Sequence, residues 1–209
     1  ATLAPVARSA REPEGWVLYG PDGAVLRRTA CLILAGGAGT AALLPDLPLQ
    51  LVRGQVEVAQ GVDAPPPVAW GGYAIPTGEG LLFGAIHDRD DTGTEVRATD
   101  TERNLAALAD RFPDLAEQAG QGPSRSRAAT RATTPDRLPW AGELDEGLYV
   151  LGGLGSRGFC LAPLLAEHIA ALCLRRPSPV PDAVARRVDP RRRDPGFAKP
   201  SLPLDVATP

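Results

Sequence analysis

The residues best suited to chemistry form a glycine-rich stretch, LGGLGSRGF, at 151–159, directly ahead of an apolar segment with helical spacing. A strand that passes through a glycine turn into a helix leaves backbone N–H groups unpaired at the positive end of the helix dipole. Such a turn favours a phosphate, a carboxylate or a delocalised anion. The structural alternative is that the glycines only allow the strand and the helix to pack closely.

A second glycine cluster, AGGAGTAALLP at 35–45, follows the apolar run CLILA. It matches the dinucleotide-binding pattern G-x-G-x-x-A at Gly37, Gly39 and Ala42. Read literally, this pattern predicts a Rossmann-type dinucleotide site. Against that interpretation, prolines within and after the cluster interrupt the chain before a full helix can form. In addition, no acidic residue that could bind a ribose ends a second strand about 20 residues further on.

Spacing and composition argue against other kinds of site. The nucleophile elbow of hydrolases requires G-x-S-x-G, but Leu154 stands two residues before Ser156. The chain has only two histidines and three cysteines, with no CxxC pair, so we expect no zinc site. No apolar run approaches the ~20 residues that cross a bilayer, so we also expect no membrane anchor.

The composition predicts a globular protein of a reducing cytoplasm. A chain of 209 residues can bury a core without disulfides, and 44% hydrophobic and 22% charged residues are ordinary values. Cys31, Cys160 and Cys173 each lie in an apolar run, which predicts buried thiols. The chain opens with neither methionine nor a signal sequence, so we expect it to be part of a longer protein.

Hydrophobic periodicity predicts the elements that position the glycine clusters. Residues 15–35 predict a hairpin around PDG and then the strand CLILA, buried on both faces as in a parallel sheet. The segments LVRGQVEVA, GGYAIPT and EGLLFGAIHD predict antiparallel strands. Residues 99–115 have amphipathic-helix spacing behind a Thr99/Asp100 cap. Residues 119–137 are polar and predict a surface connection.

The C-terminal third predicts a strand, a helix and an arm. The run LYVLGG predicts a short strand, and the helix after it has Pro163 in its first turn and ends before Pro177. Beyond that proline, the composition predicts an extended or partly disordered segment. Residues 175–199 contain seven Arg and one Lys against three Asp, a charge of +5, which leaves −8 for the rest of the chain.

The order of these motifs resembles the D-amino-acid-oxidase type of FAD oxidoreductase. The motifs are CLILAGGAG, LVRGQV, GGYAIP, LLFGAIHDRDDTGTEV, RATTPDRLPWAG and LGGLGSRGFCLAPLLAEHIAA. More narrowly, LGSRG with APLLAE, and FGAIHDRDD, are similar to the oxidoreductase half of bifunctional enzymes that make 5-methylaminomethyl-2-thiouridine in tRNA. The resemblance covers about residues 15–193 and does not include the first FAD-binding segment of such enzymes.

This resemblance implies a mixed α/β fold in which an incomplete parallel sheet of the FAD-binding type accompanies an antiparallel substrate-binding sheet. The implied domains are a hairpin at 1–30, a partial FAD-binding domain at 31–50 and 138–176, a substrate-binding domain at 51–137, and a basic Pro/Arg-rich arm at 177–209. Because one FAD-binding segment is missing, we expect the chain alone to be inactive and to hold FAD poorly.

The resemblance also implies that FAD binds at both glycine clusters. Backbone amides around residues 155–158, in the cluster at 151–159, would face the pyrimidine side of the flavin, where positive dipoles favour electron acceptance. The implied cofactor-binding residues are Gly36, Gly37, Ala38, Arg131, Gly142, Gly153, Leu154, Gly155, Ser156, Arg157 and Gly158. Arg157 is the candidate for binding a substrate carboxylate, unless it is only a surface residue. Tyr73 is the candidate for a hydrogen bond to substrate, unless it only packs on a neighbour.

The implied reaction oxidises a C–N bond next to a carboxylate. For the tRNA-modifying enzymes, the substrate is carboxymethylaminomethyl-(2-thio)uridine at the wobble position, which loses its carboxymethyl group as glyoxylate. Two alternatives stay open: oxidation of a free amine such as glycine, sarcosine or proline, and a non-catalytic pseudo-oxidoreductase module. The implied partners are a methyltransferase domain in the full-length protein and tRNA. The arginines expected to contact tRNA are Arg186, Arg187, Arg191, Arg192 and Arg193.

Overall fold

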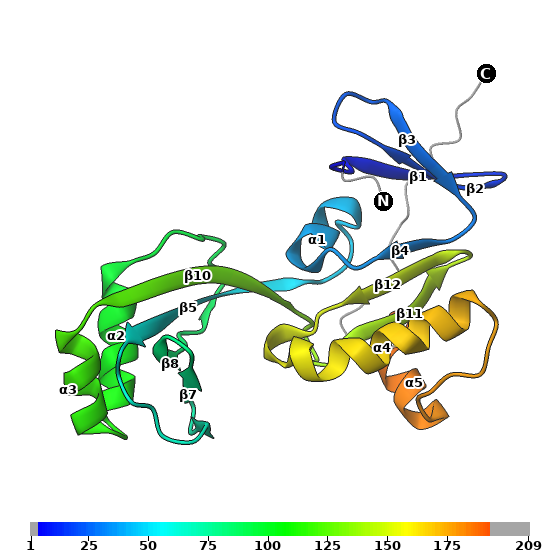
Figure 1. Cartoon of the computed structure of the whole chain (residues 1–209). Helices are drawn as coiled ribbons and strands as arrows, with labels where there is room; N and C mark the ends of the chain where they lie inside the picture. The colour runs from blue at the N-terminus through cyan, green and yellow to red at the C-terminus, as the bar shows by residue number, and fades with distance from the viewer. Residues whose placement is uncertain (1–3, 193–209) are drawn as a thin grey trace. The chain divides into compact units, whose positions relative to one another are not determined.

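The computed structural model describes residues 4–192, and these divide into two compact units (Figure 1). The first unit contains residues 4–50 and 132–192, and the second contains Leu51–Arg131. Each unit has its own sheets, helices and apolar core.

The first unit begins with a three-stranded antiparallel sheet of β1 (Arg8–Glu12), β2 (Gly15–Tyr19) and β3 (Val25–Thr29). The hairpin expected around PDG is confirmed, since β2 and β3 pair on either side of it. Strand β1 was not expected, because its sequence, RSARE, has little apolar character.

A second sheet has the order β11 (Trp140–Asp145), β12 (Leu148–Gly152), β4 (Leu32–Leu34). Strands β12 and β4 are parallel, which confirms the parallel strand expected at CLILA. The expectation that this strand is buried on both faces is wrong, because Ile33 is 46% exposed. The reason is that β4 is the last strand of the described sheet, whereas the helix that covers this sheet packs on β11 and β12.

Helices of the first unit follow the glycine loops. A 3₁₀ turn (Gly37–Gly39) leads into α1 (Thr40–Leu43), which is as short as the prolines predict. Helix α4 (Gly158–Cys173) contains Pro163 as its sixth residue, so the expectation of a first-turn proline is wrong. The expectation of an extended segment beyond Pro177 is also wrong over the described residues. Helix α5 (Asp182–Val188) packs there against β11, with Val180 and Val188 buried.

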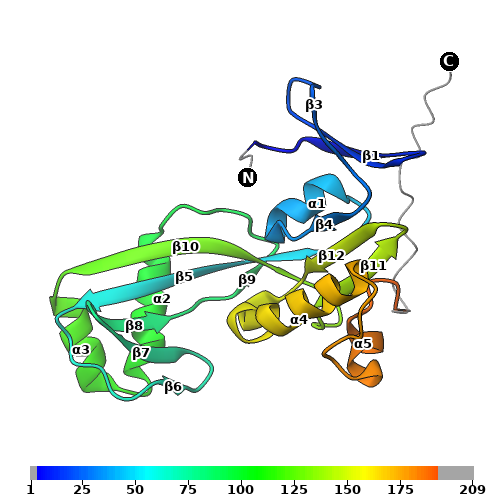
Figure 2. The same cartoon turned by 45° about the vertical axis from the view of Figure 1, so that its right-hand side comes forward.

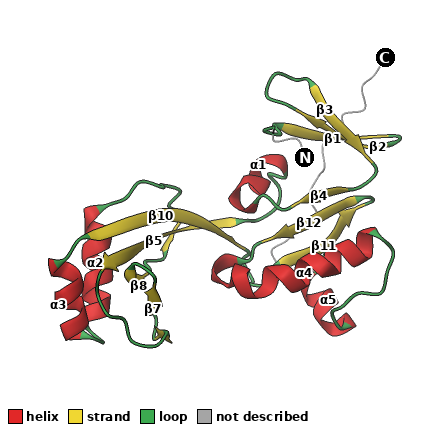
Figure 3. Ribbon diagram, in the orientation of Figure 1, coloured by secondary structure: helices red, strands yellow, loops and turns green. Residues whose placement is uncertain are grey.

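The second unit is one sheet with two helices on it (Figure 3). Its strands follow the order β10 (Ser124–Thr133), β5 (Gln50–Gln60), β8 (Gly80–Gly84), β7 (Tyr73–Thr77), β6 (Val68–Ala69). A further short strand, β9 (Asp88–Arg89), also pairs with β5. Strands β6 and β9 are labelled in Figure 2. The antiparallel pairing expected for β5, β7 and β8 is confirmed.

The helical part of this unit differs from expectation. One helix was expected over 99–115, but α2 (Ala98–Ala109) ends early and α3 (Pro113–Gln121) begins at a proline, which cannot donate an N–H to a continuing helix. Asp100 does not cap α2, since the residue at the cap is Arg97. The polar segment expected to be a surface connection is largely strand β10, whose backbone groups pair with those of β5.

A buried polar network joins β5, α2 and β10. Arg53 forms an ion pair with Asp100, and Glu57 accepts a hydrogen bond from Ser126. Gln55 Nε2 donates to Glu57 Oε1 at 3.0 Å. The residues of the network are Arg53, Gln55, Glu57, Asp100, Thr101, Asn104 and Ser126. Because buried charges are costly unless paired, this network holds one face of β5 firmly in place.

His168, on α4, is a structural histidine with a testable pH signature. It is 3% exposed, and Nδ1 lies 2.7 Å from Ser178 Oγ. Burial lowers its pKa, and this outweighs the opposing effects of a hydrogen bond to the Ala141 backbone and of the Asp189 charge. His168 is therefore neutral in the folded protein at pH values where the unfolded chain already binds a proton.

We expect the free energy of unfolding to decrease as the pH falls below about 6.5, the usual pKa of histidine, because the unfolded state then binds more protons than the folded state. In His168→Gln this decrease should be smaller. The measurement is urea unfolding at several pH values between about 5 and 8. His87→Gln, at an exposed position, is the control and should keep the decrease. An unchanged pH dependence in His168→Gln would contradict the assignment.

Candidate functional site

The two glycine clusters form neighbouring loops in the first unit. Strands β4 and β12 are parallel with Leu34 opposite Val150, so the loops that follow them leave the same edge of the sheet. Gly37 and Gly155 both have φ of +57°, a conformation that favours glycine. The carboxyl edge of a parallel sheet is where open α/β sheets bind ligands.

The loop that follows β12 ends at the N-terminus of α4. The 3₁₀ turn Gly155–Arg157 runs directly into the helix, and Arg157 at the N-cap makes no side-chain capping hydrogen bond. The first N–H groups of a 16-residue helix therefore keep their positive dipole without a capping side chain. Residues 36–38 and 153–158 therefore lie in loops that follow neighbouring parallel strands, and their contact with a cofactor stays a prediction.

Thr40 adds a residue that the sequence analysis missed. It begins α1, is 1% exposed, and its Oγ1 has no hydrogen-bond partner among the described residues. A buried hydroxyl without a partner is costly, so a partner from outside the described residues is expected to complete this turn. Its position directly after the G-x-G pattern was the available signal.

Arg157, the predicted carboxylate ligand, is exposed and already has an acceptor. Its Nη2 donates to the main-chain oxygen of Arg137 at 2.5 Å. Water solvates this exposed guanidinium, so Arg157 has no desolvation cost that an anion would offset, and its role as carboxylate ligand stays a prediction.

Arg131 has the opposite environment in the second unit. It lies on β10, is half-buried, and makes no ion pair or hydrogen bond with a described residue. Its Nη1 is buried without a partner, against Gly54 of β5. Tyr73, on β7, is within its electrostatic reach: burial raises the pKa of Tyr73, and the positive charge of Arg131 opposes that increase. Two residues predicted separately from the sequence therefore interact electrostatically within the second unit.

An uncompensated, half-buried cation is a functional-site signal. Desolvation penalises the charged form of a side chain, and a guanidinium does not escape the penalty by losing its proton. An anion supplied from outside would offset the cost, and a carboxylate fits the planar fork of arginine with two parallel hydrogen bonds. The Arg131–Tyr73 pair is the candidate anion site of the second unit.

Comparison with known proteins decides the family. The model of the FAD dependent oxidoreductase family matches residues 3–172. The chain belongs to the FAD-dependent oxidoreductase family. FAD is the cofactor of this family, and the mixed fold of parallel and antiparallel sheets described above agrees with it.

Two curated relatives of this FAD-dependent oxidoreductase are bifunctional proteins named for tRNA 5-methylaminomethyl-2-thiouridine biosynthesis, MnmC. The one from a Caulobacter species is 53% identical, covering 90% of this chain and 32% of the relative. The one from Caulobacter vibrioides is 56% identical, covering 84% of this chain and 30% of the relative. The chain thus spans about a third of the length of these relatives.

Among solved structures, glycine oxidase from Geobacillus kaustophilus has a TM-score of 0.73 at 26% identity, covering 87% of this chain and 50% of that chain. Iminodiacetate oxidase from Chelativorans also has a TM-score of 0.73, at 22% identity, covering 88% and 52%. The second likeness concerns the fold alone.

The glycine loops of this FAD-dependent oxidoreductase fit a cofactor of this kind. An added Cβ at Gly37 or Gly39 would meet nothing within 4 Å, so the space beside this loop is open to an approaching group. The uncapped N-terminus of α4 suits the electron-rich part of a flavin, and the Thr40 hydroxyl lacks a partner. Gly142, also predicted to lie beside the cofactor, has an intramolecular neighbour, since an added Cβ would lie 2.9 Å from Pro190 Cδ.

Part of the predicted tRNA-binding arm makes structural contacts instead. Arg192 Nε lies 2.7 Å from Asp136 Oδ2, and its side chain is only 12% exposed. Burial alone would raise the pKa of Asp136, but hydrogen bonds, first among them that from Arg192, lower it to about 2. Arg191 pairs with Asp189, and Arg193 lies outside the described residues.

The cysteines correct a further expectation. Cys160 is exposed rather than buried, because it lies on the outer side of α4. Cys31 and Cys173 are half-buried free thiols with their Sγ atoms 3.2 Å apart. Burial, together with the neighbouring Cys31, raises the pKa of Cys173 to about 12, which disfavours its thiolate form.

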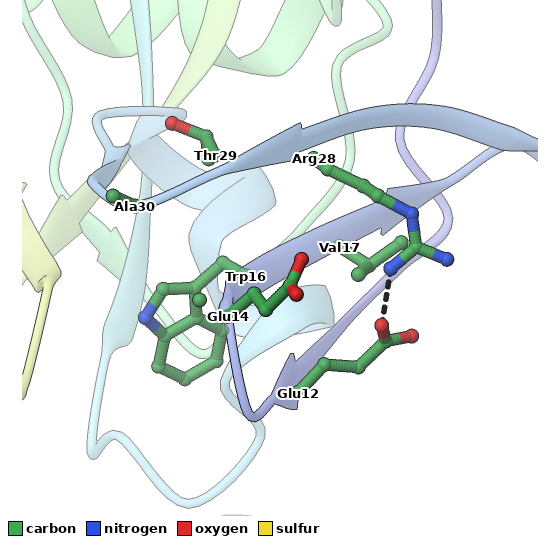
Figure 4. A pocket seen from close by; sticks show the side chains of 8 residues that line it. Glu12, Glu14, Trp16, Val17, Arg28, Thr29 and Ala30 are labelled. Carbon is green, nitrogen blue, oxygen red and sulfur yellow. Dashed lines mark hydrogen bonds and ion pairs between the residues drawn. The ribbon is translucent and has the colours of Figure 1, made fainter.

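A pocket of about 210 Å³ lies on the β1–β3 sheet (Figure 4). Glu12, Glu14 and Trp16 line it together with Arg28, which is ion-paired with Glu12. None of the predicted site residues lines it, so it is not a candidate for the cofactor. In residues 4–192, no helix is long and apolar enough to cross a membrane, and no three potential metal ligands are clustered.

Proposed function

We propose that this chain is the oxidoreductase part of an enzyme that removes the carboxymethyl group from carboxymethylaminomethyl-(2-thio)uridine at the wobble position of tRNA. The observation that carries the proposal is the Arg131 guanidinium, half-buried against Gly54 without a counter-ion and within electrostatic reach of Tyr73. The substrate of this reaction has a carboxylate next to the C–N bond, and that carboxylate is the missing anion. The names and identities of the two Caulobacter relatives support the choice of a tRNA nucleoside.

In the proposed site, Arg131 binds both carboxylate oxygens and the Tyr73 hydroxyl donates a further hydrogen bond. This fixes the methylene carbon that lies between the carboxylate and the nitrogen. FAD, when bound, supplies the acceptor for the hydride that leaves this carbon. The substrate is thereby oxidised to an imine, and water adds to its carbon. Cleavage of the C–N bond then releases glyoxylate and the aminomethyl nucleoside.

The first unit would hold the cofactor. We propose that residues 36–38 and Thr40 contact its phosphate and ribose side, and that residues 153–158 place the N-terminus of α4 near the pyrimidine ring. The positive end of the helix dipole there stabilises the negative charge that a flavin gains on reduction. The full-length protein would include a methyltransferase domain, as the bifunctional names of the relatives indicate.

A second candidate is the oxidation of a small free amino acid. The likeness to glycine oxidase favours it, because an arginine and a tyrosine could bind the carboxylate of glycine equally well. The two candidates differ in what surrounds the carboxylate, a nucleoside in a folded RNA or a single methylene group.

The test is to give the flavin-loaded full-length enzyme each substrate separately. Anaerobic loss of flavin absorbance, with glyoxylate measured, is recorded for tRNA that carries the carboxymethylaminomethyl group and for glycine, sarcosine and proline. Stoichiometric glyoxylate and a mass decrease of the wobble nucleoside would support the proposal. Rapid bleaching by a free amine with unchanged tRNA would overturn it in favour of the second candidate. No bleaching by any of them would identify a non-catalytic module.

A further inference from the structure

We infer that Gly54 is a positioning residue for the substrate carboxylate, because the side chain it lacks leaves the space that the Arg131 guanidinium occupies. The inference rests on the proposed role of Arg131. Gly54 lies in the middle of β5, in the RGQV motif, far from Arg131 in the sequence. It makes no contact with substrate in this scheme and acts only through Arg131.

The space at Gly54 is already full. An added Cβ would lie 2.6 Å from Arg131 Cζ, 2.6 Å from Nη2 and closer still to Nη1. Real Cβ atoms do not approach other atoms so closely, so either the strand or the guanidinium would have to move. All three of these nearest atoms belong to Arg131, so the conflict involves this one side chain.

The strand is the less movable of the two. On the opposite face of β5, Arg53 is ion-paired with Asp100, and Asn104 Nδ2 donates to the main-chain oxygen of Gln55 at 2.9 Å. These buried bonds hold the residues on both sides of Gly54. Gly54 also has no positive φ, so its backbone accepts alanine without strain.

The guanidinium, by contrast, ends a flexible side chain and has no bond to a described residue that would hold it. A methyl group at position 54 would therefore displace Arg131 and leave the fold intact. Gly54→Ala should therefore change the position of the guanidinium without lowering the free energy of unfolding. Most substitutions in a strand change both. Misplacement of a binding group by about 1 Å lowers catalysis by up to 10²-fold.

We expect Gly54→Ala in the flavin-loaded enzyme to raise KM for the carboxylate substrate about 10-fold, with a smaller change in kcat. The affinity for acetate, a carboxylate probe followed by its effect on flavin absorbance, should fall by a similar factor. The melting temperature and the FAD content should stay close to those of wild type. Gly120→Ala is the matched control, since an added Cβ there meets nothing within 4 Å.

A double-mutant cycle makes the inference falsifiable even if Gly54→Ala loses stability. In an Arg131→Ala background there is no guanidinium to displace, so Gly54→Ala should cause no further loss of acetate affinity. A further loss there, or wild-type KM and acetate affinity in Gly54→Ala alone, would overturn the inference. Unchanged acetate affinity in Arg131→Ala alone would instead refute the proposed role of Arg131, so the two failures are distinguishable.

Discussion

Arg131→Ala is expected to lower kcat/KM for the carboxylate-bearing amine about 100-fold, because a hydrogen bond to a charged group contributes up to about 3 kcal/mol. Arg131→Lys should recover only part of the loss, since an ammonium cannot form the paired contacts of a guanidinium. The measurement is steady-state kinetics of the flavin-loaded enzyme, with FAD content checked for each variant.

Arg157→Ala is the matched comparison, because it removes a guanidinium that is exposed and hydrogen-bonded to the Arg137 backbone. We expect it to change kcat/KM less than about 3-fold, as a solvated contact contributes little. A large loss in Arg157→Ala with normal kinetics in Arg131→Ala would assign the carboxylate to Arg157, as the sequence alone predicted.

Asp100→Ala should lower the free energy of unfolding by about 3–5 kcal/mol, because it leaves the charge of Arg53 buried and unpaired. The side chains of this pair are 0% and 4% exposed. The measurement is urea unfolding. Asp88→Ala is the control, since Asp88 pairs with the more exposed Arg103 and should cost less than about 1 kcal/mol.

Replacing both members of the buried pair tests the physical cause. The double variant Arg53→Met with Asp100→Leu should be more stable than Asp100→Ala alone, because no isolated charge remains inside the unit. A double variant no more stable than Asp100→Ala would show that the cost comes from lost shape or hydrogen bonds and not from the unpaired charge.

Elements encoded by local patterns could be predicted from the sequence. The alternation along β5, the hairpins and the two glycine loops each depend on neighbours a few residues away. Strand β10 could not be predicted in this way, because SRSRAATRAT has little strand propensity and becomes a strand through its pairing with β5. The break between α2 and α3 was predictable, since Pro113 marks it.

The candidate site divides in the same manner. The loops at 36–38 and 153–158 were predictable because a glycine loop carries its own backbone geometry, whereas their role toward a cofactor stays a prediction. The contact of Arg131 with Gly54, and its electrostatic effect on Tyr73, could not be predicted, because both depend on the order of the strands in the sheet. The missing hydrogen-bond partner of Thr40 Oγ1 likewise becomes visible only when all nearby donors and acceptors are known.

Arg192 has a consequence for how ionic strength affects this protein. The side chains of Arg192 and Asp136 are 12% and 27% exposed, so dissolved salt screens their contact less than it screens the exposed Arg186 and Arg187 on α5, whose fields fall off within a Debye length of about 8 Å at physiological salt. The basic residues near the end of the described chain therefore form two populations. If these residues bind RNA, a decrease in RNA affinity with added salt would report on Arg186 and Arg187 more than on Arg192, which is paired with Asp136.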